Sequence, residues 1–191
     1  MKKTLQFIEK YNNPKNVRFE SFYKSLLISY ERKHKIIVET GTSRGKRKYF
    51  FFNKPNWKDG MSTLIFADYA KNINGKLYSC DLDSFSISSA KKFTKSFSNY
   101  VAFINSDSLL FLKNFNQKID FLYLDSLDGH DPIKSSIHQL HEAESAINKL
   151  HNKSLVLLDD KGLKTNKSLD FFIKMKLKII NETNEQILLS F

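Results

Sequence analysis

IIVETGTSRG, residues 36–45, joins a short run of branched apolar residues to a turn that contains two glycines. An apolar run that ends in polar residues is typical of a parallel strand whose two faces are both buried. Glycine permits a tight turn and lets the backbone approach a ligand closely. Ligands of open α/β sheets bind beyond the carboxyl ends of the strands. The stretch therefore predicts an α/β fold with a ligand site at this turn.

The same pattern of strands and helices continues along the chain. Apolar runs alternate with amphipathic segments of helical spacing, which predicts a mostly parallel sheet with helices on both faces. Expected strands cover residues 35–40, 76–81, 101–105, 119–125 and 154–159, and residues 178–182 and 186–191 are expected to form an antiparallel hairpin. Expected helices cover residues 4–11, 20–31, 62–73, 87–97, 108–115, 132–150 and 169–175.

The chain of 191 residues carries 31 Lys and Arg against 20 Asp and Glu, and 41% of its residues are hydrophobic. This apolar content excludes a disordered chain, and no apolar run approaches the ~18 residues of a membrane span. Cys80 is the only cysteine, which excludes an internal disulfide and a thiolate metal cage. Gln6, Glu9 and Lys10 interrupt the apolar stretch of a signal peptide. We expect one cytoplasmic domain over residues 1–191, with a helical segment at 1–34.

Acidic residues follow the second and third expected strands. Asp81 and Asp83 come after the second, where a carboxylate can accept two hydrogen bonds from the hydroxyls of a ribose. Asp107 and Ser108 come where the third strand leads into a helix, so Asp107 could accept a hydrogen bond from an adenine amino group. A helix cap is the alternative interpretation of Asp107.

These three strand ends together resemble the class I S-adenosylmethionine-dependent methyltransferases, from about Ile36 to the end of the chain. The resemblance implies a Rossmann-like sheet of seven strands, mostly parallel with an antiparallel last strand. It also implies S-adenosylmethionine as cofactor, with its methionine part near Glu39, Gly41 and Thr42, its ribose near Asp81 and its adenine near Asp107. Four further residues complete the expected cofactor-binding set: Ser43, Gly45, Asp83 and Ser108.

The first glycine turn departs from the family pattern. It lacks one glycine of the fuller form, and the basic, aromatic residues 46–59 separate it from Gly60-Met-Ser-Thr63. We interpret residues 46–59 as an insertion beside the cofactor, a lid that carries Trp57. A surface loop without a catalytic role is the alternative.

Acids also follow the fourth and fifth expected strands. Neighbouring parallel strands lie ~4.8 Å apart, so Asp125 and the pair Asp159 and Asp160 can converge on one point. Three clustered carboxylates repel one another unless a cation or a proton compensates them, and oxygen ligands favour Mg²⁺ or another hard divalent cation. The arrangement resembles that of metal-dependent O-methyltransferases of the catechol and macrolide-sugar type. Helix capping or simple solvation of these acids is the alternative.

A divalent metal would lower the pKa of an acceptor hydroxyl and hold its oxygen in line with the methyl group. His130 and Asp128, in the loop after Asp125, are the expected general bases. Catechol enzymes place a lysine near the position of Asp128. The expected function is methyl transfer to a hydroxylated small molecule, such as a sugar or a catechol.

Other functions remain open on the sequence alone. Lys46, Arg47 and Lys48 next to three phenylalanines suit a nucleic acid, so RNA or another polyanion is the alternative acceptor. A non-catalytic binding module of the same fold is a further alternative. A zinc site at His138 and His141 is less favoured, because further ligands are lacking. A homodimer that closes the pocket is also considered, whereas a membrane partner is not expected.

Overall fold

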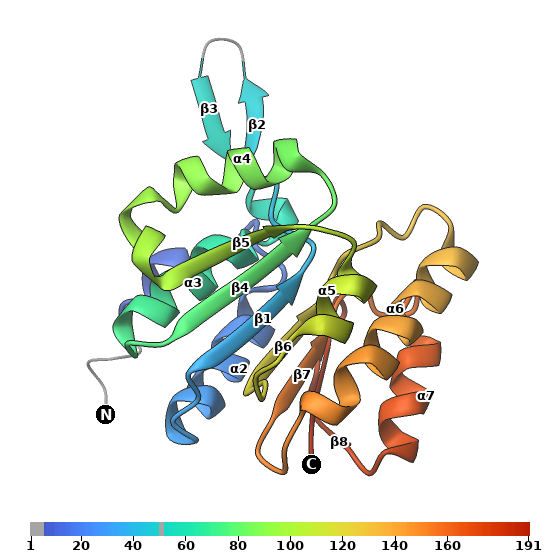
Figure 1. Ribbon diagram of the computed structural model, residues 1–191. Helices are drawn as coiled ribbons and strands as arrows, with labels where there is room; N and C mark the ends of the chain where they lie inside the picture. Colours follow the sequence, from blue (N-terminus) through green and yellow to red (C-terminus); the bar gives the residue numbers. More distant parts are fainter. Residues whose placement is uncertain (1–5, 50–51) are drawn as a thin grey trace.

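The computed structural model describes residues 6–49 and 52–191, without the side chains of 46–49, 52–55 and 59. Within these residues seven strands form one sheet (Figure 1). In spatial order they are β5 (Val101–Asn105), β4 (Lys76–Asp81), β1 (Ile36–Thr40), β6 (Phe121–Leu124), β7 (Leu155–Leu158), β9 (Ile187–Ser190) and β8 (Lys178–Glu182). The first five pair in parallel, and β9 pairs antiparallel with both β7 and β8. The Rossmann-like sheet expected from the sequence is confirmed.

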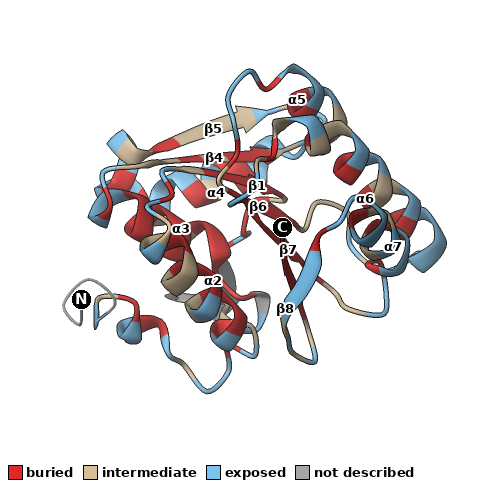
Figure 2. Cartoon of the chain, turned by 90° about the horizontal axis from the view of Figure 1, so that it is seen from below, coloured by how far each residue is buried: buried red, intermediate tan, exposed pale blue. Residues whose placement is uncertain are grey.

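The central strands are buried on both faces, which explains their unbroken apolar runs. In β6, Phe121 and Tyr123 pack into the core on one face, whereas Leu122 and Leu124 pack into the core on the other. Two helices cover the first face: α2 (Phe19–Glu31) and α3 (Ser62–Asn72). Three helices cover the second: α5 (Ser108–Asn114), α6 (Pro132–Ala146) and α7 (Asn166–Lys174). Figure 2 shows the buried sheet between these layers and the more exposed edge strand β8.

The strand order places the ligand site. The chain runs from β1 outward to β4 and β5 and then returns to the opposite side of β1 to form β6. The strand order therefore reverses beside β1, and open α/β sheets bind ligands in the crevice at such a reversal. The crevice lies between Gly41, which follows β1, and Asp125, which follows β6. The Asp125 amide donates to the Thr40 carbonyl at 2.9 Å and so extends the pairing to this edge.

Two expected helices differ from the structure. Of residues 4–11, Gln6 is helical and Glu9–Tyr11 forms a 3-10 turn, whereas Thr4 and Leu5 lie outside the described residues. In place of a helix at 87–97, α4 (Ser84–Phe93) is followed by a 3-10 helix at Lys95–Tyr100. The earlier start of α4 has a clear cause, because the Asp83 carboxylate accepts hydrogen bonds from the Phe85 and Ser86 amides.

The segment at residues 46–59 contains an antiparallel ribbon that the sequence did not predict. Its strands are β2 (Lys46–Tyr49) and β3 (Phe52–Pro55), and Figure 1 shows the ribbon extending past α4. Trp57 follows the ribbon and packs against Tyr11, with ring centroids 6.3 Å apart. It belongs to the core under α2 and α3 and not to the ribbon. A role of the ribbon as a lid stays a prediction.

No helix of the described residues is both long enough and apolar enough to cross a bilayer.

Candidate cofactor and acceptor site

The glycine turn after β1 fits against the end of β6 so closely that no side chain is possible there. Gly41 has a φ of +83°, and a Cβ atom at this residue would lie 2.0 Å from the Asp125 carbonyl oxygen. Gly45, at φ +75°, likewise faces the ring of Phe93, and a Cβ atom at Gly45 would lie 1.9 Å from the nearest ring carbon. Both residues therefore adopt conformations that favour glycine. The turn brings backbone amides to the edge of the crevice.

Glu39 lies beneath this turn and not on the wall of a cavity. Its side chain is fully buried and accepts hydrogen bonds from the hydroxyls of Ser62 (2.5 Å), Thr63 (2.8 Å) and Ser79 (2.6 Å). These three hydroxyls enclose the carboxylate, and Glu39 lines neither of the cavities described below, so its contact with a cofactor stays a prediction. Glu39 instead fixes the start of α3 and β4 relative to the turn.

Burial of Glu39 predicts a pH dependence of stability. Burial raises the pKa of Glu39 from 4.5 to about 7, although the three hydroxyls act in the opposite direction. A carboxyl group whose pKa is raised by folding stabilises the protein fully below pH 4.5, and this contribution is lost as the pH rises through 7. Between pH 4.5 and pH 8 the wild type should therefore lose about 3 kcal/mol of unfolding free energy through Glu39. We expect Glu39→Gln, which cannot ionise, not to show this loss.

Denaturant unfolding of wild type and Glu39→Gln at pH 4.5 and pH 8 measures this difference. Glu20→Gln, at an exposed position of α2, is the control variant. An identical pH profile for Glu39→Gln and wild type would contradict the prediction.

Asp81, at the end of β4, is held by two backbone amides. Thr42 N–H donates to Asp81 Oδ2 at 2.9 Å, and Asp83 N–H donates to Asp81 Oδ1 at 2.8 Å. Burial raises the pKa of Asp81, and these amides act against the rise. The Asp81 carboxylate therefore has a fixed orientation beside the glycine turn. Asp107 caps α5 through the Leu110 amide at 3.0 Å, as the alternative interpretation expected.

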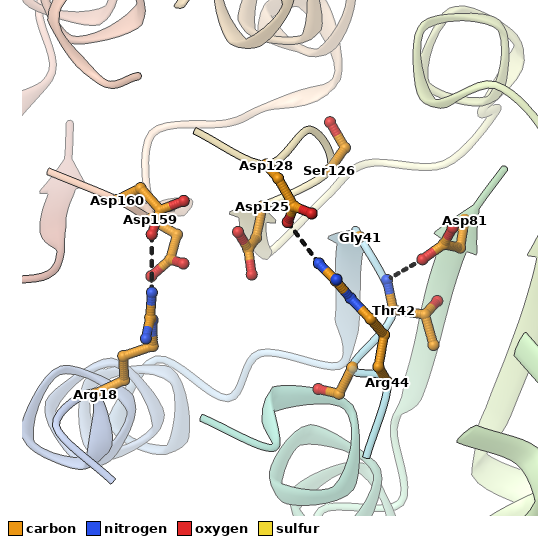
Figure 3. A pocket seen from close by; sticks show the side chains of 11 residues that line it. Arg18, Gly41, Thr42, Arg44, Asp81, Asp125, Ser126, Asp128, Asp159 and Asp160 are labelled. Atoms are coloured by element: carbon orange, nitrogen blue, oxygen red, sulfur yellow. Dashed lines mark hydrogen bonds and ion pairs between the residues drawn. The ribbon is translucent and has the colours of Figure 1, made fainter. Parts of the chain in front are cut away.

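Two cavities lie along the carboxyl edge of the sheet. One, of about 100 Å³, has walls from the end of β4, the start of α5, the loop after β6 and α6; its lining residues are Gly41, Cys80, Asp81, Leu82, Asp107, Ser108, Ser126, Leu127 and His138. The other, of about 120 Å³, opens toward α2; its lining residues are Arg18, Gly41, Thr42, Ser43, Arg44, Asp81, Asp125, Ser126, Asp128, Asp159 and Asp160 (Figure 3). The cavities share Gly41, Asp81 and Ser126, so they form two parts of one crevice.

The three acids that were expected to bind a metal do converge. Asp125, Asp159 and Asp160 offer carboxylate oxygens that lie within 4.8 Å of one another. Two basic side chains lie among them. Arg18 donates through Nε to Asp159 at 2.7 Å and through Nη2 to Asp160 at 2.8 Å. Lys164 Nζ lies 2.8 Å from Asp125 Oδ1 and 3.1 Å from Asp160 Oδ2.

Gln186 and Tyr123 complete this cluster, which we call the acid ring. Gln186 Nε2 donates to Asp159 Oδ1 at 2.7 Å and to the Tyr123 hydroxyl at 3.2 Å. The Tyr123 hydroxyl in turn donates to Asp125 Oδ2 at 3.2 Å. Among the described residues, five of the six carboxylate oxygens of the ring therefore accept a hydrogen bond or an ion pair from a protein donor.

The acid ring does not fit a divalent cation. A metal ligand must offer oxygen lone pairs to the ion, and here N–H and O–H groups already point at those oxygens. Arg18 and Lys164 also compensate two of the three negative charges and would repel a cation placed between the acids. The clustered acids do require positive charge, as the sequence indicates, but protein side chains provide it. The expectation of Mg²⁺ ligands at Asp125, Asp159 and Asp160 does not match this arrangement.

The charged groups of the acid ring shift one another's pKa values. Burial and the neighbouring Asp125 raise the pKa of Asp159 to about 6, and the Arg18 guanidinium only partly offsets them. Burial lowers the pKa of Lys164, but the attraction of Asp125, Asp160 and Asp159 outweighs burial and the net pKa is raised. The three acids therefore favour the charged form of Lys164.

The expected general bases lie apart from one another. Asp128 lines the cavity near Arg18, but it is half-exposed and forms an ion pair with Arg44 at 2.5 Å (Figure 3). His130 is exposed and lies outside both cavities. Asp125 lies at the cavity wall as well, where Tyr123 and Lys164 hold its carboxylate, and its side chain is 28% exposed against 51% for Asp128.

Several site residues were not predicted from the sequence. Arg18 precedes α2 and is far from the acids along the chain, so no local pattern could link them. Lys164 follows Asp160 by four residues, a spacing that permits an ion pair within one turn.

The two histidines that were considered for zinc lie apart from the acid ring. His138 faces Ser108 at 3.0 Å and lines the first cavity, whereas His141 is exposed. In the described part of the chain, the histidines join no metal-like cluster.

A methyltransferase domain family matches residues 57–161. No curated protein sequence matches the chain. A candidate O-methyltransferase from Klebsiella pneumoniae is 15% identical at a TM-score of 0.64, with 98% of this chain and 89% of that chain covered. The methyltransferase of Podospora anserina bound to S-adenosylhomocysteine is 11% identical at a TM-score of 0.60, with 98% and 86% covered. An rRNA methylase from Streptococcus thermophilus is 12% identical at a TM-score of 0.60, with 88% of this chain and 94% of that chain covered.

Proposed function

Because the chain belongs to the methyltransferase domain family, we propose that it transfers the methyl group of S-adenosylmethionine to a hydroxyl oxygen of a small molecule. The observation that carries the proposal is the division of the crevice into two cavities that share Gly41, Asp81 and Ser126. One cavity can hold an adenosyl group, and the other can hold an acceptor. Their common wall is where the two reacting atoms would meet.

The first cavity offers the groups that an adenosine requires. Asp81 lines this cavity, and two backbone amides orient its carboxylate. There it can accept hydrogen bonds from ribose hydroxyls. Leu82 and Leu127 provide apolar surface for a flat base, and Ser108 and Asp107 provide polar groups at its edge. The expected cofactor residues Asp107 and Ser108 thus remain part of the proposal.

The charge of the second cavity favours a neutral or cationic acceptor. Five acids line its wall, against the two bases Arg18 and Arg44; the acids are Asp81, Asp125, Asp128, Asp159 and Asp160. A phosphate group would meet a net negative surface there, although the whole chain carries a charge of +11. Sugars and phenols, which carry hydroxyls without a negative charge, suit this wall.

The chemistry needs a proton acceptor beside the reacting oxygen. The bound cofactor supplies an electrophilic methyl group on a sulfonium. As the new carbon–oxygen bond forms and the carbon–sulfur bond breaks, the hydroxyl proton moves to a carboxylate. Asp125 is the residue that we assign to this role, because it lines the acceptor cavity directly beside Ser126 of the common wall. The Mg²⁺ of the sequence-based expectation is not included, since the acid ring already contains Arg18 and Lys164.

Calorimetric titration with S-adenosylhomocysteine tests the cofactor part. We expect binding by wild type and at least a tenfold weaker affinity for Asp81→Asn, because a hydrogen bond to a charged group contributes about 1.5 to 3 kcal/mol. Asp170→Asn, exposed on α7, is the matched control and should bind as wild type does. Circular dichroism of Asp81→Asn shows whether the turn that Asp81 supports has remained folded.

The same samples separate the other functions. A protein that binds no S-adenosylhomocysteine would fit the non-catalytic module. Binding of an oligoribonucleotide that weakens steeply with salt would favour RNA as the acceptor, with the basic ribbon β2–β3 as its contact surface.

A further inference from the structure

We propose that Lys164 takes the position of a divalent metal in this site, so that the protein carries out methyl transfer with a built-in cation. The inference rests on the proposed function for its role in methyl transfer. The position of Lys164 and its effect on metal affinity are testable without that function.

The surroundings of Lys164 are those of a bound cation. Its side chain is 2% exposed, although lysine is among the residues least often buried. The ammonium lies 2.8 Å from Asp125 Oδ1, 3.1 Å from Asp160 Oδ2 and 3.2 Å from the carbonyl oxygen of Leu127. An ammonium group has three N–H donors, so each has one oxygen acceptor. Two carboxylates and one carbonyl are the ligand types that hard cations take from proteins.

The contact with Leu127 connects this cation to both cavities. Leu127 lines the first cavity, and its neighbours Ser126 and Asp128 line the second. Lys164 thus holds the loop after β6 by its backbone as well as by the carboxylate of Asp125. In this position the ammonium performs the two tasks of a structural metal, which are charge compensation and fixation of the ligand loop.

Arg18 completes the compensation from the other side. Asp160 has a φ of +54°, an uncommon value outside glycine, and directs one carboxylate oxygen to Arg18 and the other to Lys164. A divalent ion could enter only if the buried ammonium moved away, and it would then lie next to the Arg18 guanidinium. The cluster is therefore built for two monovalent cations on fixed stems.

Nearby lysines do not share these features. Lys161, in the same turn, is one-third exposed and pairs with Glu182 of the edge strand β8. It contacts none of the three acids in the described hydrogen bonds and ion pairs. Lys161→Ala is therefore a matched control for the removal of Lys164.

Mn²⁺ titration followed by electron paramagnetic resonance tests the inference in the wild type. We expect no Mn²⁺ site of sub-millimolar affinity, and we expect S-adenosylhomocysteine binding to be unchanged by a chelator. Tight Mn²⁺ binding to wild type that Asp159→Asn abolishes would overturn the inference. This arm decides the question even if no variant of Lys164 folds.

Removal of the ammonium should open the site to a metal. We expect Lys164→Met, which keeps most of the apolar stem, to bind Mn²⁺ at least ten times more tightly than wild type or Lys161→Ala. A rise in its melting temperature with Mn²⁺ would report the same gain. If a folded Lys164→Met has the same weak Mn²⁺ affinity as wild type, Lys164 does not occupy a metal position. If the wild type does not bind S-adenosylhomocysteine, that result counts against the proposed function and leaves the Mn²⁺ results unaffected.

Discussion

Gly41→Ala is expected to lower the free energy of unfolding by about 2 to 5 kcal/mol and to abolish S-adenosylhomocysteine binding. The left-handed backbone at φ +83° costs an alanine about 1 to 2 kcal/mol. The added methyl group would also lie 2.0 Å from the Asp125 carbonyl oxygen. Because this contact is with backbone and not with a flexible side chain, the strands must separate, which costs about 1 to 3 kcal/mol more.

Gly162→Ala is the matched control for this prediction. Gly162 has a φ of +80°, but a Cβ atom there would meet nothing within 4 Å among the described residues. Gly162→Ala should therefore lower the free energy of unfolding only by the cost of the left-handed backbone, about 1 to 2 kcal/mol. Denaturant unfolding of both variants measures the difference. Equal losses for the two glycines would mean that the close approach of Gly41 to β6 adds no constraint.

Arg18→Met is expected to cost about 3 to 5 kcal/mol of unfolding free energy, because it leaves the buried acid ring short of a cation. The Arg18 side chain is 13% exposed and that of Asp159 is 1% exposed, so water replaces little of the lost interaction. Arg44→Met removes the same side chain type from a pair whose members are 61% and 51% exposed. Such a surface pair contributes about 0 to 1 kcal/mol.

A double-mutant cycle shows whether the cost of Arg18→Met comes from Asp159. Combined with Asp159→Asn, the arginine replacement should cost at least about 1 kcal/mol less than it does alone, because no buried charge is then left without its partner. Additive losses would place the effect of Arg18 elsewhere, for example in its bond to the Lys58 carbonyl.

The sequence predicts the sheet well because its strands have an unusually direct signature. Runs such as Phe121–Leu124 are apolar at every position, since alternate residues enter two different cores. Their polar ends then mark the carboxyl edge, and adjacency in the sheet brings Asp125 to Asp159 without further information. The β2–β3 ribbon lacks such a signature, because its basic and aromatic residues do not alternate.

Partners from outside a strand end are harder to predict. The pairing of Arg18 with Asp159 joins residues 141 positions apart and depends on how α2 crosses the sheet. The family resemblance placed Glu39 near the cofactor, yet alternation along β1 directs its side chain to the face covered by α3, where Ser62 and Thr63 bind it. His130 follows Asp125 closely in sequence, but the loop carries it away from the cavities.

The composition of the acid ring has a consequence for the order of folding. Its members come from the start of α2, from the ends of β6 and β7, and from Gln186 next to β9, which enters the sheet between β7 and β8. Contacts between residues so distant in the chain form late, because a long loop must close before they are gained. During synthesis the three acids therefore emerge without the last partner of their ring. The reactive edge of the sheet becomes complete only after the final hairpin has docked.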